Sequence, residues 1–129
     1  MHNSWTLFTT LELTGNEVYI SDIVEDTGGA IWVATDSAGL LRFSDGEWSS
    51  LSSTDPGVGL PGDSITCITV APDGSLWFGL WNNGAARFDG SEWTVYRDGL
   101  IDQTVNDIFF DPNGAIWFAT LGGVSRLSP

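Results

Sequence analysis

The sequence predicts an all-β fold built from three repeats, each made of four short antiparallel strands. The first observation is the composition: the 129 residues include 16 glycines, 5 prolines, 7 tryptophans and 7 phenylalanines, a balance typical of short strands joined by tight turns. The second is a Trp-centred segment that occurs three times, at residues 29–35, 74–80 and 114–120. The third is a further copied segment, because residues 41–48 match residues 86–93.

The second repeat shows its expected strands most clearly. Residues 64–70 and 75–80 should form the first two strands, and the sequence Ala71-Pro72-Asp73-Gly74 should form the turn between them. Residues 85–88 and 93–97 should form the third and fourth strands, after turns rich in Asn, Asp and Gly. Four strands in a period of about 40–45 residues are typical of one β-propeller blade.

The chain is therefore expected to be a β-propeller with three four-stranded blades in one unit, residues 1–129. The expected blades are about 18–51, 64–97 and 104–127. The third repeat stops after its third strand, whereas the segment from Trp5 to Phe8 matches the fourth strand of the other repeats. We therefore expect strand 4–9 of a neighbouring chain to complete the last blade.

Three blades are too few to close a propeller ring, which needs roughly four to eight. The ring is therefore expected to be closed by oligomerisation, and two chains would give six blades. The sequence favours this six-bladed dimer. A larger ring and an unclosed fragment of a longer or designed protein remain alternatives.

The repeats resemble those of the two-component regulator propeller family. The resemblance covers residues 5–127 and rests on the following segments: Ile20-x-x-Ile23, Ile65-x-x-Ile68, Val105-x-x-Ile108, Asp111–Thr120 and Gly123–Leu127. In that family such repeats usually form periplasmic sensor regions of hybrid histidine kinases. The resemblance therefore implies a propeller fold and a periplasmic or extracellular setting. This chain departs from the family pattern because it has three blades, no kinase and no recognisable signal peptide.

Charge and residue inventory exclude several classes of function. Seventeen acidic residues against four arginines, with no lysine, give a net charge of -13, which disfavours nucleic acids and anionic membranes as partners. No run of 18 apolar residues is present, so no membrane span is expected. Cys67 is the only cysteine and His2 the only histidine, which leaves little for a disulfide, a zinc site or a catalytic triad.

We therefore expect no catalytic residue, no metal site and no cofactor, and we predict that the chain is not an enzyme. The repeats also resemble, more distantly, the streptogramin B lyase propellers. Their elimination chemistry depends on a histidine and a metal-bound carboxylate, and no residue of this chain matches that histidine.

The candidate ligand site lies on the loops that join second and third strands. Trp81 breaks the repeat there, because Asp36 and Leu121 occupy the matching places. With its neighbours Asn82 and Asn83, Trp81 would offer a ring for stacking and amides for hydrogen bonding, as a sugar or another small polar ligand requires. Trp81, Asn82, Asn83 and Asp36 are the candidate ligand-binding residues. The structural alternative is that Trp81 plugs the ring or contacts another chain.

The function that the sequence favours is a non-enzymatic scaffold or recognition module that binds a small polar ligand or a protein. The alternative is a carbohydrate-binding lectin of the oligomeric propeller kind. A lectin should repeat its aromatic and polar cluster in every blade, whereas the Trp81 cluster occurs once.

A second set of candidates stands near the start of the innermost strands. Asp22, Cys67 and Asp107 occupy equivalent positions and should line the mouth of the central channel. Their carboxylates could hold a hard cation. Ordinary solvated carboxylates and an inert buried thiol are the alternatives.

Three further repeated features are predicted to be structural. Arg42, Arg87 and Arg126 should each pair with a carboxylate or stack on an aromatic ring, although a ring of anion-binding arginines is the functional alternative. The turns at Asp73-Gly74 and Asn113-Gly114 resemble type I′ hairpins and lack the spacing of calcium loops. The repeated tryptophans are expected to be buried between blades: Trp32, Trp77 and Trp117.

Overall fold

A computed structural model describes residues 3–129, so His2 lies outside the described part of the chain. Eleven strands form three antiparallel sheets, which confirms the predicted all-β propeller architecture. The first sheet has the order β1-β2-β3-β4 and the second β5-β6-β7-β8, whereas the third has only β9-β10-β11. The strands are β1 (Ile20–Glu25), β2 (Ile31–Thr35), β3 (Leu40–Ser44), β4 (Glu47–Leu51), β5 (Ile65–Val70), β6 (Leu76–Leu80), β7 (Ala85–Phe88), β8 (Trp93–Tyr96), β9 (Val105–Phe110), β10 (Ile116–Thr120) and β11 (Gly123–Leu127). We call the three sheets blades 1, 2 and 3.

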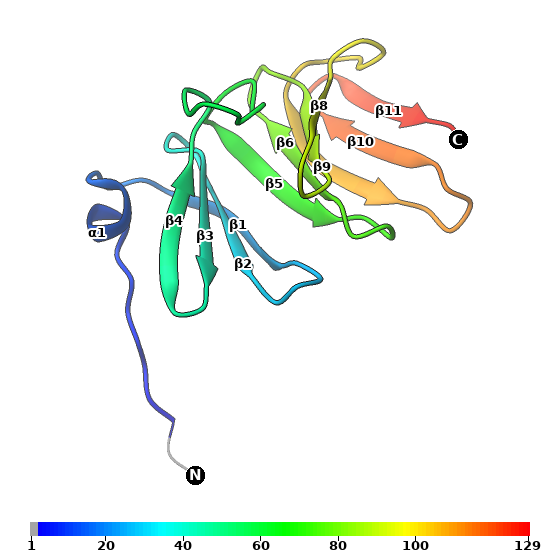
Figure 1. Ribbon diagram of the computed structural model, residues 1–129. Coiled ribbons are helices and arrows are strands. Elements are labelled where there is room, and N and C mark those ends of the chain that lie inside the picture. Colours follow the sequence, from blue (N-terminus) through cyan, green and yellow to red (C-terminus); the bar gives the residue numbers. More distant parts are fainter. Residues whose placement is uncertain (1–2) are drawn as a thin grey trace.

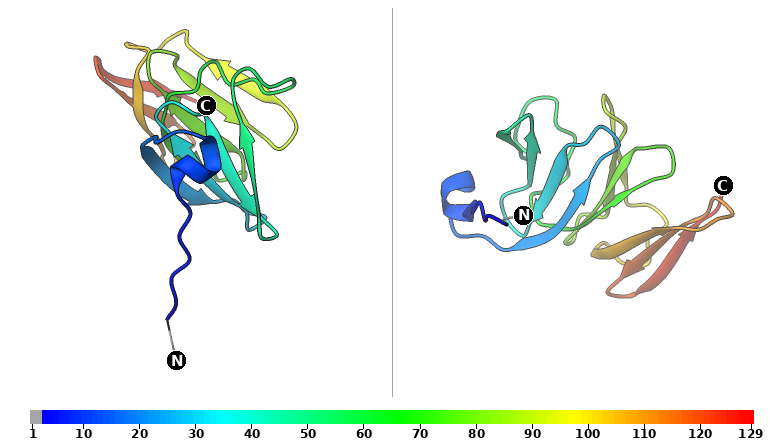
Figure 2. Two further views of the ribbon diagram at one scale, coloured as in Figure 1. Left: turned by 90° about the vertical axis from the view of Figure 1, so that its left-hand side faces the viewer. Right: turned by 90° about the horizontal axis from the view of Figure 1, so that it is seen from below.

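The blades stand side by side as an open arc (Figures 1 and 2). In the right-hand view of Figure 2, where the molecule is seen from below, α1 (Thr10–Thr14) lies at one end of the arc and β11 at the other. The innermost strands β1, β5 and β9 are the neighbours that join one blade to the next. No helix in residues 3–129 combines the length and the apolar composition needed to cross a membrane.

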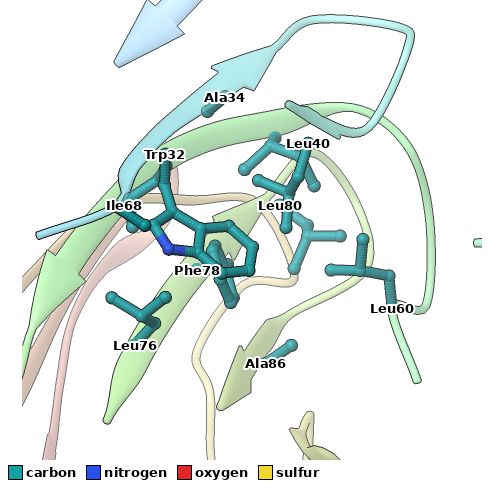
Figure 3. Close-up of a cluster of buried hydrophobic side chains, with 11 residues drawn as sticks. Trp32, Ala34, Leu40, Leu60, Ile68, Leu76, Phe78, Leu80 and Ala86 are labelled. Carbon is teal, nitrogen blue, oxygen red and sulfur yellow. The ribbon is translucent and has the colours of Figure 1, made fainter. Parts of the chain in front are cut away.

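The core lies between the blades rather than inside any one of them. Trp32 of blade 1 packs against Phe78 and Phe88 of blade 2, with ring centroids 6.3 and 6.2 Å apart. Figure 3 shows this cluster, to which Leu76 and Ile68 also belong. The second cluster repeats the arrangement between blades 2 and 3. Each sheet is therefore buried only where another blade covers it, which explains the continuous apolar runs in the sequence.

Each innermost strand contains a β-bulge at the same place. The register slips between Ile20 and Asp22 in β1, between Ile65 and Cys67 in β5, and next to Asp107 in β9. A bulge adds one residue to one strand of the pair and increases the local twist. The repeated bulges therefore give the three blades the same bend where they meet.

The type I′ interpretation of two turns is wrong. That turn needs positive φ at both central residues, and here only Gly74 (φ 86°) and Gly114 (φ 88°) have it. Their N–H groups donate to the carbonyl oxygens of Ala71 and Asp111, which closes a four-residue turn with the glycine in last place. The turn between β3 and β4 does have two positive φ values, because Asp45 and Gly46 have φ of 53° and 79°.

The two ends of the arc differ from its middle. Trp32 and Trp77 are only 3% and 4% exposed, whereas Trp117 is 37% exposed because no blade covers its side of blade 3. The prediction that all three tryptophans are buried is therefore wrong for Trp117 in a single chain. Residues 3–9 form no strand. Phe8 contacts Phe43 and Trp48 of blade 1, and the chain before it extends away from the sheets (Figure 1).

Candidate functional site

The loop between β6 and β7 presents Trp81 at the surface. Its side chain is 54% exposed, and its backbone N–H donates to the carbonyl oxygen of Ser64 at 3.0 Å. Asp36 and Leu121 make the same backbone contact in their own blades, to the carbonyl oxygens of Tyr19 and Thr104. All three blades therefore hold this position in the same way, and only blade 2 places an indole there.

Polar contacts fix the backbone of the Trp81 loop. Asn82 has a left-handed conformation (φ 59°), and its N–H donates to Thr104 Oγ1 at 2.9 Å. Arg97 donates to Asn83 Oδ1 at 3.2 Å and to its carbonyl oxygen at 3.4 Å. Within residues 3–129 no hydrogen bond engages the indole N–H of Trp81 or the side-chain amide of Asn82. The loop is therefore rigid, while these two groups face solvent.

Asp36 is occupied elsewhere. Its Oδ1 accepts hydrogen bonds from the Tyr19 N–H at 3.0 Å and from Ser37 Oγ at 3.2 Å. These bonds join the loop after β2 to the segment before β1. In the described part of the chain no hydrogen bond or aromatic contact links Asp36 to the Trp81 loop, so the structure groups Trp81 with Asn82 and Asn83 but does not add Asp36.

Asp22, Cys67 and Asp107 lie at the bulges of β1, β5 and β9. Asp22 Oδ2 accepts the Ile68 N–H at 3.0 Å across the boundary between blades 1 and 2, while Asp107 Oδ1 accepts the N–H of Ile108 at 2.9 Å. Burial raises the pKa of the Cys67 thiol to about 11, and the carboxylates of Asp107 and Asp22 act in the same direction. The two carboxylates thus satisfy backbone donors of the innermost strands, and the thiol stays protonated at neutral pH.

These three positions do not form a cation site within one chain. Among residues 3–129, no three His, Cys, Asp or Glu side chains gather closely enough to hold a metal ion. Blades are also linked near these positions, since Thr66 Oγ1 donates to the Val105 carbonyl oxygen and Thr69 Oγ1 to that of Ile108.

The structural interpretation of the repeated arginines is confirmed. The Arg42 guanidinium lies 5.7 Å from the ring centroid of Trp32, and that of Arg126 lies 5.5 Å from Trp117. Arg87 pairs with Asp73 instead, at 3.1 Å, because Tyr96 stacks on the ring of Trp77.

The sequence did not indicate a pocket of about 410 Å³ between blades 1 and 2, at the end of the strands opposite the Trp81 loop. Asp26, Trp32, Arg42 and Asp89 contribute to its lining. Burial alone would raise the pKa of Asp26, but hydrogen bonds from the Trp32 indole and two backbone N–H groups lower it overall. Arg42 and the Asp73-Gly74 turn, both noted in the sequence, lie at this end of the blades, but neither pattern predicts a pocket.

Comparison with known families identifies the repeats. The family model described as "Two component regulator propeller" matches residues 59–82 and 99–122. Each match covers the end of one inter-blade connection, the innermost strand and the second strand of a blade. No curated protein sequence matches the chain at a significant level.

Solved structures show the same fold. The extracellular domain of BT4673 from B. thetaiotaomicron, described as a hybrid two component system, has a TM-score of 0.78 and 22% identity over 98% of this chain. The corresponding domain of BT3049 from the same organism has a TM-score of 0.68 and 23% identity over 84% of this chain. The chain spans only 19% of the first domain and 15% of the second.

Virginiamycin B lyase from Staphylococcus aureus is also similar in fold, with a TM-score of 0.68 and 20% identity over 91% of this chain and 43% of the lyase. One fold thus carries both extracellular domains of two-component systems and a lyase, so fold likeness alone does not assign an activity. The matched segments, the blades and the register agree with one another: residues 59–82 and 99–122 match the two-component regulator propeller repeat, and the chain has the propeller fold.

Proposed function

We propose that the chain is a non-enzymatic recognition module in which the Trp81 loop binds a small polar ligand. The observation that carries this proposal is a half-exposed indole on a rigid loop, at a position where the other blades have Asp36 and Leu121. Exposure of the large apolar indole ring to water is unfavourable. A loop whose backbone is already held by hydrogen bonds loses little conformational entropy when it binds a ligand. The free indole N–H and the Asn82 amide supply donors and an acceptor beside the ring.

The comparisons support this class of function without assigning a ligand. Two structural relatives are extracellular domains of proteins described as two component systems. Domains of that kind suggest recognition, and a propeller offers a loop face for it.

The side-chain chemistry also favours binding over catalysis. The one thiol, Cys67, is buried with its pKa raised to about 11, which makes it a poor nucleophile near neutral pH. The carboxylates of Asp22 and Asp107 already accept backbone hydrogen bonds.

Titration of tryptophan fluorescence tests the proposal. The purified chain is titrated with a panel of monosaccharides, disaccharides, amino acids and nucleosides. We expect saturable quenching by one class, lost in Trp81→Ala and kept in Leu121→Ala, because Leu121 holds the equivalent exposed position in blade 3. A response confined to sugars would identify a lectin. Equal binding by Trp81→Ala and the wild type would refute the proposed site.

A further inference from the structure

We propose that the N-terminal segment, residues 4–8, adds to β11 of a second copy of this chain as the fourth strand of blade 3, with Trp5 in a pocket beside Phe118 and Leu127. Equivalent positions of the three blades differ in ways that carry this assignment, which goes beyond ligand recognition.

Blade 2 shows what the tryptophan of a fourth strand does. Trp93, the first residue of β8, stacks on Phe88 with ring centroids 4.5 Å apart and on Phe78 at 5.8 Å. The connection from blade 1 crosses above it so closely that a Cβ on Gly59 would overlap the Trp93 side chain. Trp93 is thus held between its own blade and the incoming chain.

Blade 3 has the same surroundings without the tryptophan. Leu127 and Phe118 are the equivalents of Phe88 and Phe78, and together with Tyr96 and Leu100 they line a pocket of about 90 Å³. Gly99 stands where Gly59 stands in blade 2 and also lines this pocket, but nothing lies within 4 Å of a Cβ built on it. The pocket is therefore the place that Trp93 fills one blade earlier.

The repeat also fixes the register of the added strand. In blades 1 and 2 the tryptophan pairs with Phe43 or Phe88, one residue beyond the repeated arginine. The same register places Trp5 opposite Leu127, Thr6 opposite Arg126 and Leu7 opposite Ser125. The equivalents of Leu7, which are Ser50 and Val95, are exposed, so Leu7 should face solvent.

The donor end is already arranged for this exchange. Phe8 packs against Phe43 and Trp48 of its own blade 1, with ring centroids 5.6 and 5.3 Å apart. Leu51, which ends the fourth strand of blade 1, likewise lines one pocket with Phe88 of the following blade. Phe8 therefore lies beside Phe43 of blade 1 as Leu51, the last residue of a fourth strand, lies beside Phe88 of blade 2.

The two end faces of the arc are complementary halves of one interface. Ile23 on the free face of blade 1 is 61% exposed, whereas its equivalents Ile68 and Ile108 are 3% exposed in the inter-blade clusters. Trp117 on the free face of blade 3 is 37% exposed, whereas Trp32 and Trp77 are buried in those same clusters. One chain carries both halves, so the free face of blade 1 in each copy can meet the free face of blade 3 in the other. These two equivalent interfaces close six blades around a two-fold axis.

The first experiment measures the mass of the chain and of two variants by light scattering coupled to size exclusion. We expect twice 13.9 kDa for the wild type and for Leu7→Ser, and loss of that species in Trp5→Ser. Leu7→Ser is the matched control, because it removes a large apolar side chain from the same segment at a position whose equivalents, Ser50 and Val95, are exposed. A folded wild-type monomer, or equal effects of the two substitutions, would overturn the proposal.

The second experiment tests the register of the added strand. It does not require a variant whose third blade lacks its fourth strand. Directly paired residues of antiparallel strands bring their Cα atoms to about 4.5–5.5 Å, which suits a disulfide. A variant with Leu7→Cys and Ser125→Cys should therefore form a covalent dimer under mild oxidation, while Thr6→Cys with Ser125→Cys should not, because Thr6 points to the other face. Native Cys67 is buried and does not compete. Crosslinking in the shifted pair alone, or in neither pair, would contradict the assigned register.

Discussion

At the scale of single residues, the repeated tryptophan of the second strand is structural wherever a blade covers it. Trp77 packs against Tyr96, Phe110 and Phe118, with ring centroids 4.9, 5.5 and 6.2 Å apart. Trp77→Ala should therefore lower the free energy of unfolding by about 3–5 kcal/mol, through lost burial and the cavity left behind. Urea denaturation at fixed protein concentration measures this change. Trp81→Ala in the same blade is the control, and comparable losses for both variants would argue against the difference in packing.

Asp73 gives the stability of blade 2 a dependence on acid pH. Its hydrogen bonds with Ser75, and secondarily its contact with Arg87, lower its pKa from 3.8 to about 2. A lowered pKa stabilises the folded state above the unfolded pKa, and that contribution is lost as the pH falls from about 4 toward 2. Asp73→Asn should therefore flatten the fall in unfolding free energy over this interval. Asp98→Asn, at an exposed carboxylate, should leave the slope unchanged. A wild-type slope in Asp73→Asn would refute the assignment.

The sequence predicts the role of a single residue well where that role depends on residues that recur with it, and poorly where it depends on the pairing of strands. The arginines could be assigned because a cation in a structural repeat needs a nearby carboxylate or ring, and both kinds of partner recur with it. The turns at Gly74 and Gly114 were misassigned because an Asp-Gly or Asn-Gly pair fits two turn types. Which type forms depends on whether the turn holds two or three residues, and strand register decides that.

At the scale of elements, the repeat located the blades, but it could not reveal features that have no sequence signature of their own. The bulges at Asp22, Cys67 and Asp107 lie inside the repeated pattern Ile/Val-x-x-Ile, but that pattern does not distinguish a bulged strand from a regular one. Helix α1, residues 10–14, is a single turn between a Thr9 cap and a left-handed Gly15, and such a turn is too short to leave a periodic pattern. The Trp81 loop was found because it departs from the repeat.

The N-terminal segment is the element whose removal should have the largest effect. Without residues 1–8, the outer edge of β11 has no strand to pair with, and an unpaired edge favours aggregation. The truncated chain should lose the dimeric species and scatter light at concentrations where the full chain stays clear. Removal of residues 1–3 alone should change neither property, because it leaves Trp5 and Phe8 in place. A soluble truncated chain with unchanged mass would exclude strand exchange.

At the scale of the whole molecule, the open arc shows what a single sequence leaves undetermined. Ile23, Phe109 and Trp117 are apolar residues of predicted strands, yet all three are exposed in one chain. Burial in a propeller depends on the next blade, so an end blade has the same sequence pattern as an interior blade. The repeat count and the displaced fourth strand indicated a missing neighbour, while only the three-dimensional arrangement shows which faces are free.

If two copies share both end faces and both N-terminal strands, folding and association become one event. The midpoint of thermal unfolding should then rise with protein concentration, because each tenfold increase adds about 1.4 kcal/mol per mole of dimer. For a dimer of this size, that corresponds to a shift of about 2–4 °C. Circular dichroism melts over a hundredfold range of concentration measure this shift. Trp5→Ser should melt lower and independently of concentration, since its fourth strand no longer docks. A wild-type midpoint that stays constant over that range would mean that the three blades are stable without a partner.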